Sequence, residues 1–465
     1  MVKRVVRRKR KKPSQFSRPI IPATAPVKQE EMNLTLYMEL VLKRTFGPQR
    51  RCCWSSGESE DILVAFFSRS PLLLMYAVPS DKKVKVGVLG ATGTVGQRFI
   101  ALLENHPYFV VHVVGASARS AGKSYAVGTN WKQTTAIPAG VRDLLIRPCE
   151  PEHFKDCAVV FSGLDADAAG EIGACIQSHY GDDHIFYHCP NTEGSFRAAE
   201  LAVFSNAKSY RRDPNVPLVV PLVNPHHLNI IPQQRKFHSP ALQKGFIVTN
   251  ANCSTTGIVI PLVALERAFG PIESCLVTTL QAISGAGYPG VPSLDVFDNV
   301  VPYISGEEEK MEWETLKILG ELSQTDGQLA FEMHARTPLR VSASCTRVPV
   351  IEGHTETVSV RFARRPAPSP QQVREALTAY TPVVQSAGCP SAPRHAIWVH
   401  EEPDRPQPRL DRMFQQGAGV SVGRVRQCPV LDIKFVVLSN NVNIGAATSS
   451  IINAEMAIAT QLITV

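Results

Sequence analysis

The first regular pattern along the chain is a β-branched apolar run at residues 84–89, followed at once by a glycine-rich segment. Residues 97–104 then place apolar side chains at helical spacing, and residues 109–114 form a second β-branched run. This order of strand, turn, helix and strand is typical of the opening of a doubly wound α/β sheet. The apolar pattern predicts further strands at residues 158–161, 201–204 and 216–222.

The pattern changes after Cys253, which precedes an apolar stretch with helical spacing at residues 258–268. Alternating or β-branched runs follow, and they predict an antiparallel sheet in a second domain, at residues 276–282, 341–348 and 355–362. The segment from Ser369 to Gln372 reads Ser-Pro-Gln-Gln, which predicts a helix start with a capping box and Pro at its first position. A last helix is expected at about residues 446–462, packed on the first domain.

Composition sets outer limits on the class of protein. A length of 465 residues predicts two domains with appendages, and 44% hydrophobic with 19% charged residues is typical of a globular protein. The 11 cysteines show no C-x-x-C pair, so neither a zinc site nor a disulfide framework is expected, and a reducing compartment fits best. No uncharged apolar run of transmembrane length occurs, and the basic start lacks the apolar region of a secretory signal.

The net charge of +8 belongs to one end of the chain. Residues 1–51 carry 14 Lys and Arg against three Glu, a net charge of +11, so the remaining chain carries a net charge of −3. Residues 7–12 are all basic, and such a block is usually a solvated arm, although it can bind nucleic acid or direct nuclear import. The acidic remainder argues against nucleic-acid binding by the body of the protein.

The glycine-rich segment has the arrangement of a dinucleotide-binding turn. A first glycine permits a tight turn after the strand, and later glycines let backbone N–H groups approach a pyrophosphate at a helix N-terminus. Plain turns also use glycine, but here the segment stands between a strand and a helix as the motif requires. The residues expected to bind the dinucleotide here are Gly90, Thr92, Gly93, Thr94, Val95 and Gly96.

The end of the second strand discriminates between NAD and NADP. Enzymes that use NAD usually carry an acid there, which bonds the ribose hydroxyls. Residues 115–123 contain no acid, whereas Ser117, Arg119 and Ser120 offer hydrogen-bond donors and a positive charge for a 2′-phosphate. An ordinary basic loop is the alternative, and NADP(H) is the favoured cofactor.

Cys253 is a candidate nucleophile because a helix N-terminus stabilises a thiolate, the reactive form of cysteine. By spacing alone a buried structural cysteine is the better interpretation, and His354 alone would be an ordinary loop or core histidine. The set of motifs changes this interpretation. Several segments together and in order resemble the fungal and archaeal branch of the aspartate-semialdehyde dehydrogenases, namely residues 90–96, 162–167, 252–253, 281–290, 304–310, 345–354 and 406–411.

The resemblance implies a fold and an activity. It implies a Rossmann-like NADP-binding domain at residues 81–252, a catalytic and dimerisation α+β domain at 253–440, and a C-terminal helix at 441–465 that returns to the first domain. It also implies that NADPH reduces 4-phospho-L-aspartate to aspartate 4-semialdehyde with release of phosphate, in the biosynthesis of lysine, threonine, methionine and isoleucine. A homodimer or homotetramer in the cytoplasm is implied, without a metal.

The resemblance also assigns roles to residues. Cys253 would form a thioester, His354 would be the general acid/base, and Gln281 would orient the acyl group. Arg347 would bind the substrate carboxylate and Glu307 the ammonium group. Phosphate would contact Lys310 and Arg211, with help from Asn252. Further positions along the dinucleotide would be Ser162, Gly163, Ser284, Gly285, Asn441 and Gly445, although Asn440 and Asn443 depart from the residues expected beside them.

Two segments depart from the family pattern, the basic extension at residues 1–80 and an atypical insertion at about 174–198. Because the insertion precedes Arg211, it puts phosphate binding in question. Related thioester-forming reductases remain possible, such as N-acetyl-glutamyl-phosphate reductase, whose cysteine signature is not seen, and malonyl-CoA reductase. Two further hypotheses are a nucleic-acid-binding or regulatory protein that uses the basic arm, with nuclear or organellar targeting left open, and a catalytically inactive relative.

Overall fold

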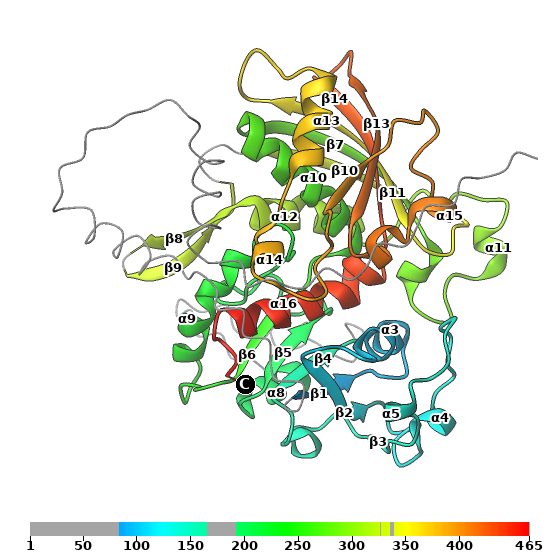
Figure 1. Cartoon of the computed structure of the whole chain (residues 1–465), viewed down its shortest axis with the longest axis vertical. Coiled ribbons are helices and arrows are strands. Elements are labelled where there is room, and N and C mark those ends of the chain that lie inside the picture. Colours follow the sequence, from blue (N-terminus) through cyan, green and yellow to red (C-terminus); the bar gives the residue numbers. More distant parts are fainter. Residues whose placement is uncertain (1–82, 165–191, 326, 335–338, 465) are drawn as a thin grey trace, which may run out of the picture. The chain divides into compact units, whose positions relative to one another are not determined.

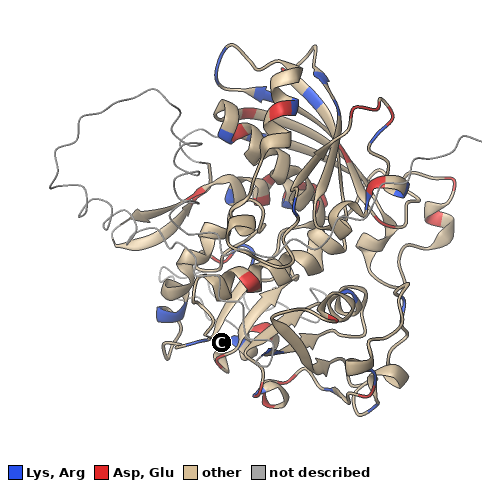
Figure 2. Cartoon of the chain, viewed as in Figure 1, with Lys and Arg blue, Asp and Glu red and all other residues tan. Residues whose placement is uncertain are grey.

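The computed structural model describes residues 83–164, 192–325, 327–334 and 339–464, and Figure 1 shows their arrangement. The N-terminal extension at 1–80 and residues 174–191 of the expected insertion lie outside these ranges. Within the described ranges, no helix has both the length and the apolar content that crossing a bilayer requires. Lys and Arg are interspersed with Asp and Glu over this part of the chain, as Figure 2 shows.

The first sheet is parallel throughout, with the strand order β3-β2-β1-β4-β5-β6. Its strands are almost entirely buried, which explains their continuous apolar runs. The strand order reverses between β1 and β4, and in such sheets ligands bind outside the carboxyl ends at this point. The strands are β1 (Val84–Leu89), β2 (Phe109–Gly115), β3 (Ile146–Arg147), β4 (Val159–Ser162), β5 (Ala202–Ser205) and β6 (Phe246–Thr249).

The strand expected at residues 216–222 does not form, and the expectation was wrong. The segment is mostly irregular and ends in a turn, and it is linked to the sheet by an isolated bridge between Leu218 and Thr249 of β6. Pro217 and Pro221 explain the outcome, because proline has no backbone N–H to donate to a neighbouring strand. The apolar residues of the segment are buried nevertheless, so they contribute to the core as a loop.

Helices cover both faces of the first sheet. Phe99 and Ile100 of α3 (Thr94–Leu103) share one apolar cluster with Ile451 of α16 (Thr448–Ala459), and Figure 1 shows α16 in red. A second cluster contains Phe196 of α8 (Thr192–Ala198) and Phe154 of η1 (Pro151–Phe154). The remaining helical segments here are α4 (Tyr125–Gly128), α5 (Ala139–Arg142), η2 (Pro225–Ile230) and α9 (Ile231–Lys236).

The second sheet has the order β10-β7-β11-β14-β13-β12 and is mixed, not antiparallel as expected. β10 runs parallel to β7, and β12 runs parallel to β13. The long connection between β7 and β10 explains the first pair, because parallel neighbours need a long crossover. The strands are β7 (Ile272–Gln281), β10 (Arg340–Arg347), β11 (His354–Phe362), β12 (Ile397–Val399), β13 (Val420–Gln427) and β14 (Ile433–Ser439), with a separate hairpin of β8 (Glu321–Thr325) and β9 (Gln328–Glu332).

The helix α10 (Cys253–Phe269) is buried along most of its length and contacts β7, β11, β13 and β14. It also packs on α12 (Glu307–Leu319) and α13 (Pro370–Ala379), and α13 begins with the capping box and proline that the sequence predicts. After β14 a π-helical turn, η5 (Asn443–Ala447), leads into α16 and back to the first sheet. Short helical segments complete the fold, namely η3 (Ile283–Ala286), α11 (Ser293–Val296), α14 (Val383–Ser386), α15 (Pro408–Asp411) and η4 (Phe414–Gly417).

Candidate active site

A cavity of about 520 Å³ lies at the carboxyl ends of the first-sheet strands, next to the N-termini of α3, α10 and α12. Most of the residues expected from the sequence line it directly, namely Gly90, Thr92, Gly93, Thr94, Val95, Ser117, Gly163, Arg211, Asn252, Cys253, Ser284, Gly285, Glu307, Lys310, Asn441 and Gly445. Gln281, Arg347 and His354 are buried behind this lining and connect to it through contacts described below. Gly96, Arg119, Ser120 and Ser162 are not part of the lining.

The glycine turn is shaped to bring backbone close to a bound anion. Gly90 has a φ of 63°, and a Cβ atom there would lie 2.7 Å from the carbonyl oxygen of Gly163. A Cβ on Gly96 would clash with the carbonyl of Gly90, so the turn and α3 pack without room for side chains. The N-cap of α3, Gly93, provides no side-chain cap, and Gly93, Thr94 and Val95 line the cavity. This arrangement fits the phosphates of a dinucleotide.

The residues expected near the ribose phosphate are not equally available. Ser117 and Arg119 are exposed, and Ser117 lines the cavity. Ser120 instead donates its hydroxyl to the carbonyl oxygen of Gly128 at 3.2 Å. Ser162 is fully buried, and its carbonyl oxygen accepts a hydrogen bond from Nδ2 of Asn206 at 3.0 Å. Ser120 and Ser162 therefore shape the surroundings of the cavity rather than its surface.

Cys253 is the first residue of α10, and its Sγ atom lies 3.2 Å from Nε2 of His354. Asn252 caps the helix by accepting hydrogen bonds from the backbone N–H groups of Ser254 and Thr255. Burial, and next the carboxylate of Glu307, raise the pKa of the Cys253 thiol to about 12. The sequence predicts a thiolate stabilised by the helix terminus. In the ligand-free protein burial outweighs that effect, so the sulfur keeps its proton at neutral pH.

His354 is held in one tautomer by the backbone. The N–H of Ala282 donates to Nδ1 of His354 at 3.0 Å. Burial, and next the charge of Arg347, lower the pKa of His354 to about 3, so the ring is neutral. A neutral imidazole has one N–H, and since Nδ1 accepts, the hydrogen is on Nε2 and points toward the sulfur. Any proton exchange by this ring therefore takes place at Nε2.

Gln281 and Arg347 end the neighbouring strands β7 and β10 and are paired in register. Arg347 donates from Nη1 to the carbonyl oxygen of Ala282 at 2.8 Å and to Oε1 of Gln281 at 3.5 Å. His354 begins β11 on the other side of β7, and a turn with Gly353 at a φ of 100° separates it from Arg347. The guanidinium and the imidazole nevertheless lie close together, because a Cβ atom on Gly285 would lie 2.9 Å from Nη1 of Arg347 and 3.2 Å from Nε2 of His354.

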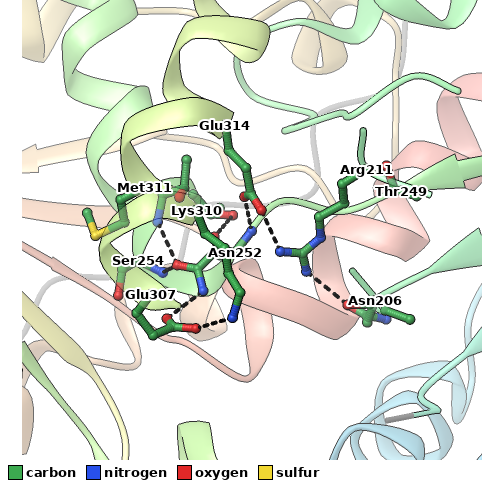
Figure 3. Close-up of polar contacts among 12 residues, drawn as sticks. Asn206, Arg211, Thr249, Asn252, Ser254, Glu307, Lys310, Met311 and Glu314 are labelled. Atoms are coloured by element: carbon green, nitrogen blue, oxygen red, sulfur yellow. Dashed lines mark hydrogen bonds and ion pairs between the residues drawn. The ribbon is translucent and has the colours of Figure 1, made fainter. Parts of the chain in front are cut away.

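Glu307 and Lys310 lie on one face of α12, as their spacing predicts. Lys310 Nζ is 2.7 Å from Oε1 of Glu307, and Nδ2 of Asn252 donates to the other oxygen at 2.6 Å (Figure 3). Burial would raise the pKa of Glu307, but the ammonium of Lys310 and the two hydrogen bonds hold it below its usual value. The carboxylate therefore stays charged beside Cys253 and provides a site for a cation.

Arg211 lies on the loop after β5 and faces the cavity. Its Nη1 atom contacts Oε1 of Glu314 at 2.7 Å, and its Nη2 atom donates to the carbonyl oxygen of Asn206 at 2.9 Å (Figure 3). Sequence reasoning did not identify Glu314, nor Lys208, an exposed cation that also lines the cavity. The position of Glu314, seven residues after Glu307 on the same helix face, was the available signal.

The chain after β14 closes the cavity beside the thiol. Asn441 donates from Nδ2 to the hydroxyl of Ser284 at 2.9 Å and accepts a hydrogen bond from the N–H of Gly353. A Cβ atom on Gly445 would lie 2.9 Å from the Cβ of Cys253, so this position needs glycine. The two residues that depart from the family pattern form hydrogen bonds with backbone groups. Asn440 accepts hydrogen bonds from two N–H groups, and Asn443 donates to the carbonyl oxygen of Gln416.

Comparison with known proteins agrees with this geometry. Residues 85–179 match the family model for the semialdehyde dehydrogenase NAD binding domain, and residues 262–444 match that for the semialdehyde dehydrogenase dimerisation domain. The aspartate-semialdehyde dehydrogenase of Cryptococcus neoformans is 60% identical over 383 residues, covering 82% of this chain and 98% of the relative. That of Saccharomyces cerevisiae is 51% identical over 389 residues, covering 83% and 100%.

A solved structure of aspartate-semialdehyde dehydrogenase with NADP from Candida albicans superimposes with a TM-score of 0.72 at 49% identity, covering 82% of this chain and 100% of that chain. The family models and this neighbour confirm the predicted fold class and the predicted cofactor, NADP(H). The chain belongs to the aspartate-semialdehyde dehydrogenase family of oxidoreductases.

Proposed function

We propose that the chain reduces 4-phospho-L-aspartate to L-aspartate 4-semialdehyde with NADPH, through a thioester on Cys253. The observation that carries this proposal is the 3.2 Å contact between Sγ of Cys253 and Nε2 of His354, at a cavity that the glycine turn also lines. A nucleophile that shares one cavity with a dinucleotide site can be acylated and then reduced without release of the acyl group.

The charged groups around the thiol match the substrate group by group. Arg347 is buried near His354, where a guanidinium can bind the carboxylate through two hydrogen bonds. Glu307 is held ionised and supplies the negative charge for the substrate ammonium. Lys310 and Arg211 line the cavity and supply two cations for phosphate, with Asn252 between them. We assign Gln281, between Arg347 and Glu307, the orientation of the acyl group.

The proposed steps balance in atoms and charge. The Cys253 sulfur attacks the acyl carbon, a carbon–sulfur bond forms, the bond to the phosphate oxygen breaks, and the departing phosphate carries away the thiol proton. Bound NADPH supplies the hydride that reduces the thioester carbon to a hemithioacetal oxyanion. The oxyanion collapses, the carbon–sulfur bond breaks and the aldehyde is released, while the Cys253 thiolate takes up the one proton consumed overall and returns to the thiol. The Nε2–H of His354 donates to the sulfur and to the oxyanion, stabilising the charge in both steps.

The backbone around the cavity is assigned to the dinucleotide. Residues 90–96, Gly163, Ser284 and Gly285 would contact the pyrophosphate and the nicotinamide half, and Ser117 and Arg119 would receive the 2′-phosphate. Asn441 and Gly445 line the same cavity as Cys253, with Gly445 in direct contact with it, and would border the nicotinamide. This assignment is supported by the N-terminus of α3, which has no side-chain cap, and by glycines at positions where a Cβ atom would clash with neighbouring backbone.

We also propose the domain organisation and assembly. The first domain spans residues 81–252, the second spans 253–440, and the segment 441–465 returns to the first. Leu276 and Leu280 of β7 are 47% and 37% exposed, which favours coverage of this face of the second sheet by another copy in a homodimer or homotetramer. A cytoplasmic location fits a reducing compartment.

The test is oxidation of aspartate semialdehyde by NADP with phosphate present, followed as NADPH formation by the wild type and by Cys253→Ser. The matched control is Cys428→Ser, which changes a buried cysteine in the turn between β13 and β14, outside the cavity lining. We expect phosphate-dependent activity in the wild type and the control and a loss of at least about 10³-fold in Cys253→Ser. A wild type that forms no NADPH would refute the assignment, and near-normal Cys253→Ser would remove the thiol from its role.

An acyl-CoA reductase is the second candidate function, since it would use the same thioester chemistry. The cation group of Arg211 and Lys310 beside the thiol favours a phosphate ester as the leaving group. Reduction of malonyl-CoA by the wild type, in place of phosphate-dependent activity on aspartate semialdehyde, would reverse this preference.

A further inference from the structure

Glu314 is a buried carboxylate that has no role in the proposed steps, yet it joins two parts of the site. It is 1% exposed, lies on the inner face of α12 two turns after Glu307, and is absent from the cavity lining. Its two oxygens accept from different partners: Oε1 contacts Nη1 of Arg211 at 2.7 Å, and Oε2 accepts from the backbone N–H of Asn252 at 2.6 Å (Figure 3).

The second of these partners fixes the residue before the nucleophile. The side-chain oxygen of Asn252 caps α10, its Nδ2 donates to Glu307, and its backbone N–H donates to Glu314. With these three attachments Asn252 cannot rotate without breaking a buried hydrogen bond, which costs about 1–3 kcal/mol. The position of Cys253, the next residue, therefore depends on Glu314.

The first partner fixes the anion-binding loop. Arg211 uses Nη1 for Glu314 and Nη2 for Asn206, while its Nε atom has no hydrogen-bond partner among the described residues. One helical turn after Glu314, Nζ of Lys317 donates to the carbonyl oxygens of Arg211, Asp213 and Val216 at 2.9–3.0 Å. The loop is thus attached to α12 through the side chain of Arg211 and through its backbone.

We propose that Glu314 is a positioning residue that sets the distance between the phosphate subsite and the sulfur of Cys253. This inference rests on the proposed function, because it assumes that Arg211 binds the phosphate that the thiol displaces. Glu314 acts through Arg211 and Asn252 and does not touch the substrate. Its role is to hold the guanidinium and the helix N-terminus in one rigid unit, so that a bound acyl phosphate presents its carbon to the sulfur.

The chemistry of the two partners makes Glu314→Gln an informative change. Arg211 and the Asn252 N–H are both donors, and a carboxylate can accept from both. An amide of the same size has one acceptor oxygen and one NH₂ group, so it can accept from one partner and must face the other as a second donor. Because the Asn252 backbone is fixed by α10, we expect the amide oxygen to stay there and the NH₂ group to displace Arg211.

The experiment measures kcat and the KM values for phosphate, aspartate semialdehyde and NADP in the oxidative direction. The matched control is Glu309→Gln, the same change at an exposed position of the same helix. For Glu314→Gln we expect a rise of at least about tenfold in the phosphate KM, the equivalent of about 1.4 kcal/mol, with the NADP KM within about twofold of the wild type. Glu309→Gln should match the wild type in every parameter.

Two outcomes would overturn the inference. One is an unchanged phosphate KM in Glu314→Gln. The other is a similar change in all three KM values accompanied by a lower Tm, which indicates a general structural role. If Glu314→Gln does not fold, Glu314→Asp provides the same test, because its shorter side chain can reach only one of the two partners.

A double-mutant comparison separates positioning from general damage. If Glu314 acts on phosphate only through Arg211, then adding Glu314→Gln to Arg211→Lys should raise the phosphate KM by less than about twofold beyond Arg211→Lys alone. If the two substitutions instead raise the phosphate KM of the double variant by the product of their separate effects, the inference is overturned. A wild type without phosphate-dependent activity is a different result, because it refutes the proposed function itself before any variant is compared.

Discussion

Glu356 on β11 should make the stability of this protein depend on pH in an unusual direction. It is 0% exposed, and neither carboxyl oxygen has a hydrogen-bond partner among the described residues. The group faces the first turns of α10, where a Cβ atom on Gly257 would lie 3.1 Å from its Oε1 atom. Burial raises the pKa of Glu356 well above its ordinary value, so the folded protein retains the proton of this side chain over a pH range in which an exposed carboxyl group is ionised.

The sign of the effect follows from proton binding. The unfolded chain releases the Glu356 proton above about pH 4.3, whereas the folded chain retains it. The stability contributed by this group is therefore complete below the unfolded pKa and is lost as the pH rises toward the folded pKa, by about 1.4 kcal/mol for each pH unit. Glu356→Gln keeps the size of the side chain but cannot ionise, so its stability lacks this slope.

The assay compares the Tm of the wild type and of Glu356→Gln from about pH 5 to about pH 7, with Glu309→Gln as an exposed control. Relative to the wild type, Glu356→Gln should gain up to about 1.4 kcal/mol of stability for each pH unit below the folded pKa of Glu356, and Glu309→Gln should run parallel to the wild type. The infrared difference spectrum should show the carbonyl stretch of a protonated acid that Glu356→Gln lacks. A constant Tm difference across this range, or the absence of that band, would refute the reasoning.

Four further predictions concern the site and the fold. Alkylation of Cys253 by iodoacetamide in the ligand-free protein should accelerate about tenfold per pH unit through about pH 9, because burial raises the thiol pKa to about 12; a plateau near neutral pH would contradict this. Gly445→Ala should lower kcat and reduce stability by about 1–3 kcal/mol in thermal unfolding, since its methyl would press on Cys253. Arg119→Ala should raise the KM for NADPH by about 10- to 100-fold and leave that for NADH nearly unchanged, because only NADPH offers a phosphate to the guanidinium; equal changes in both would exclude this role. Ser369→Ala should reduce stability by about 1 kcal/mol in thermal unfolding through loss of the capping box. Its activity should equal that of the wild type at a temperature well below the Tm of both proteins.

The parts of the fold that could be predicted from the sequence depend on short-range interactions. β1, the glycine turn, α3 and β2 follow one another within about thirty residues, and each has a local cause in strand propensity, turn chemistry or helical spacing. The start of α13 was predicted because a capping box and a proline are recognisable within four residues. At such positions the local pattern and the tertiary environment favour the same structure.

The features that escaped prediction depend on contacts between distant segments. The apolar residues at 216–222 have the composition of a strand, but strand pairing needs N–H donors, and two prolines remove them. The parallel pairing of β10 with β7 is set by the path of the chain through α12, which alternation of apolar residues does not encode. The connection between two strands determines whether they run parallel or antiparallel, whereas the two-residue alternation of apolar side chains depends only on the single strand.

The same distinction applies to the chemistry of the site. A cysteine at a helix N-terminus is visible in the sequence and suggests a low thiol pKa, but in the folded protein the pKa depends on burial and on Glu307, which is 54 residues away in the chain. The two arginines that lower this pKa, Arg347 and Arg211, come from two further elements. In the proposed complex the substrate ammonium would offset Glu307, and its carboxylate and phosphate would offset the arginines. Reactivity of the sulfur would then be set by the order in which these charges are paired, which only the assembled site determines.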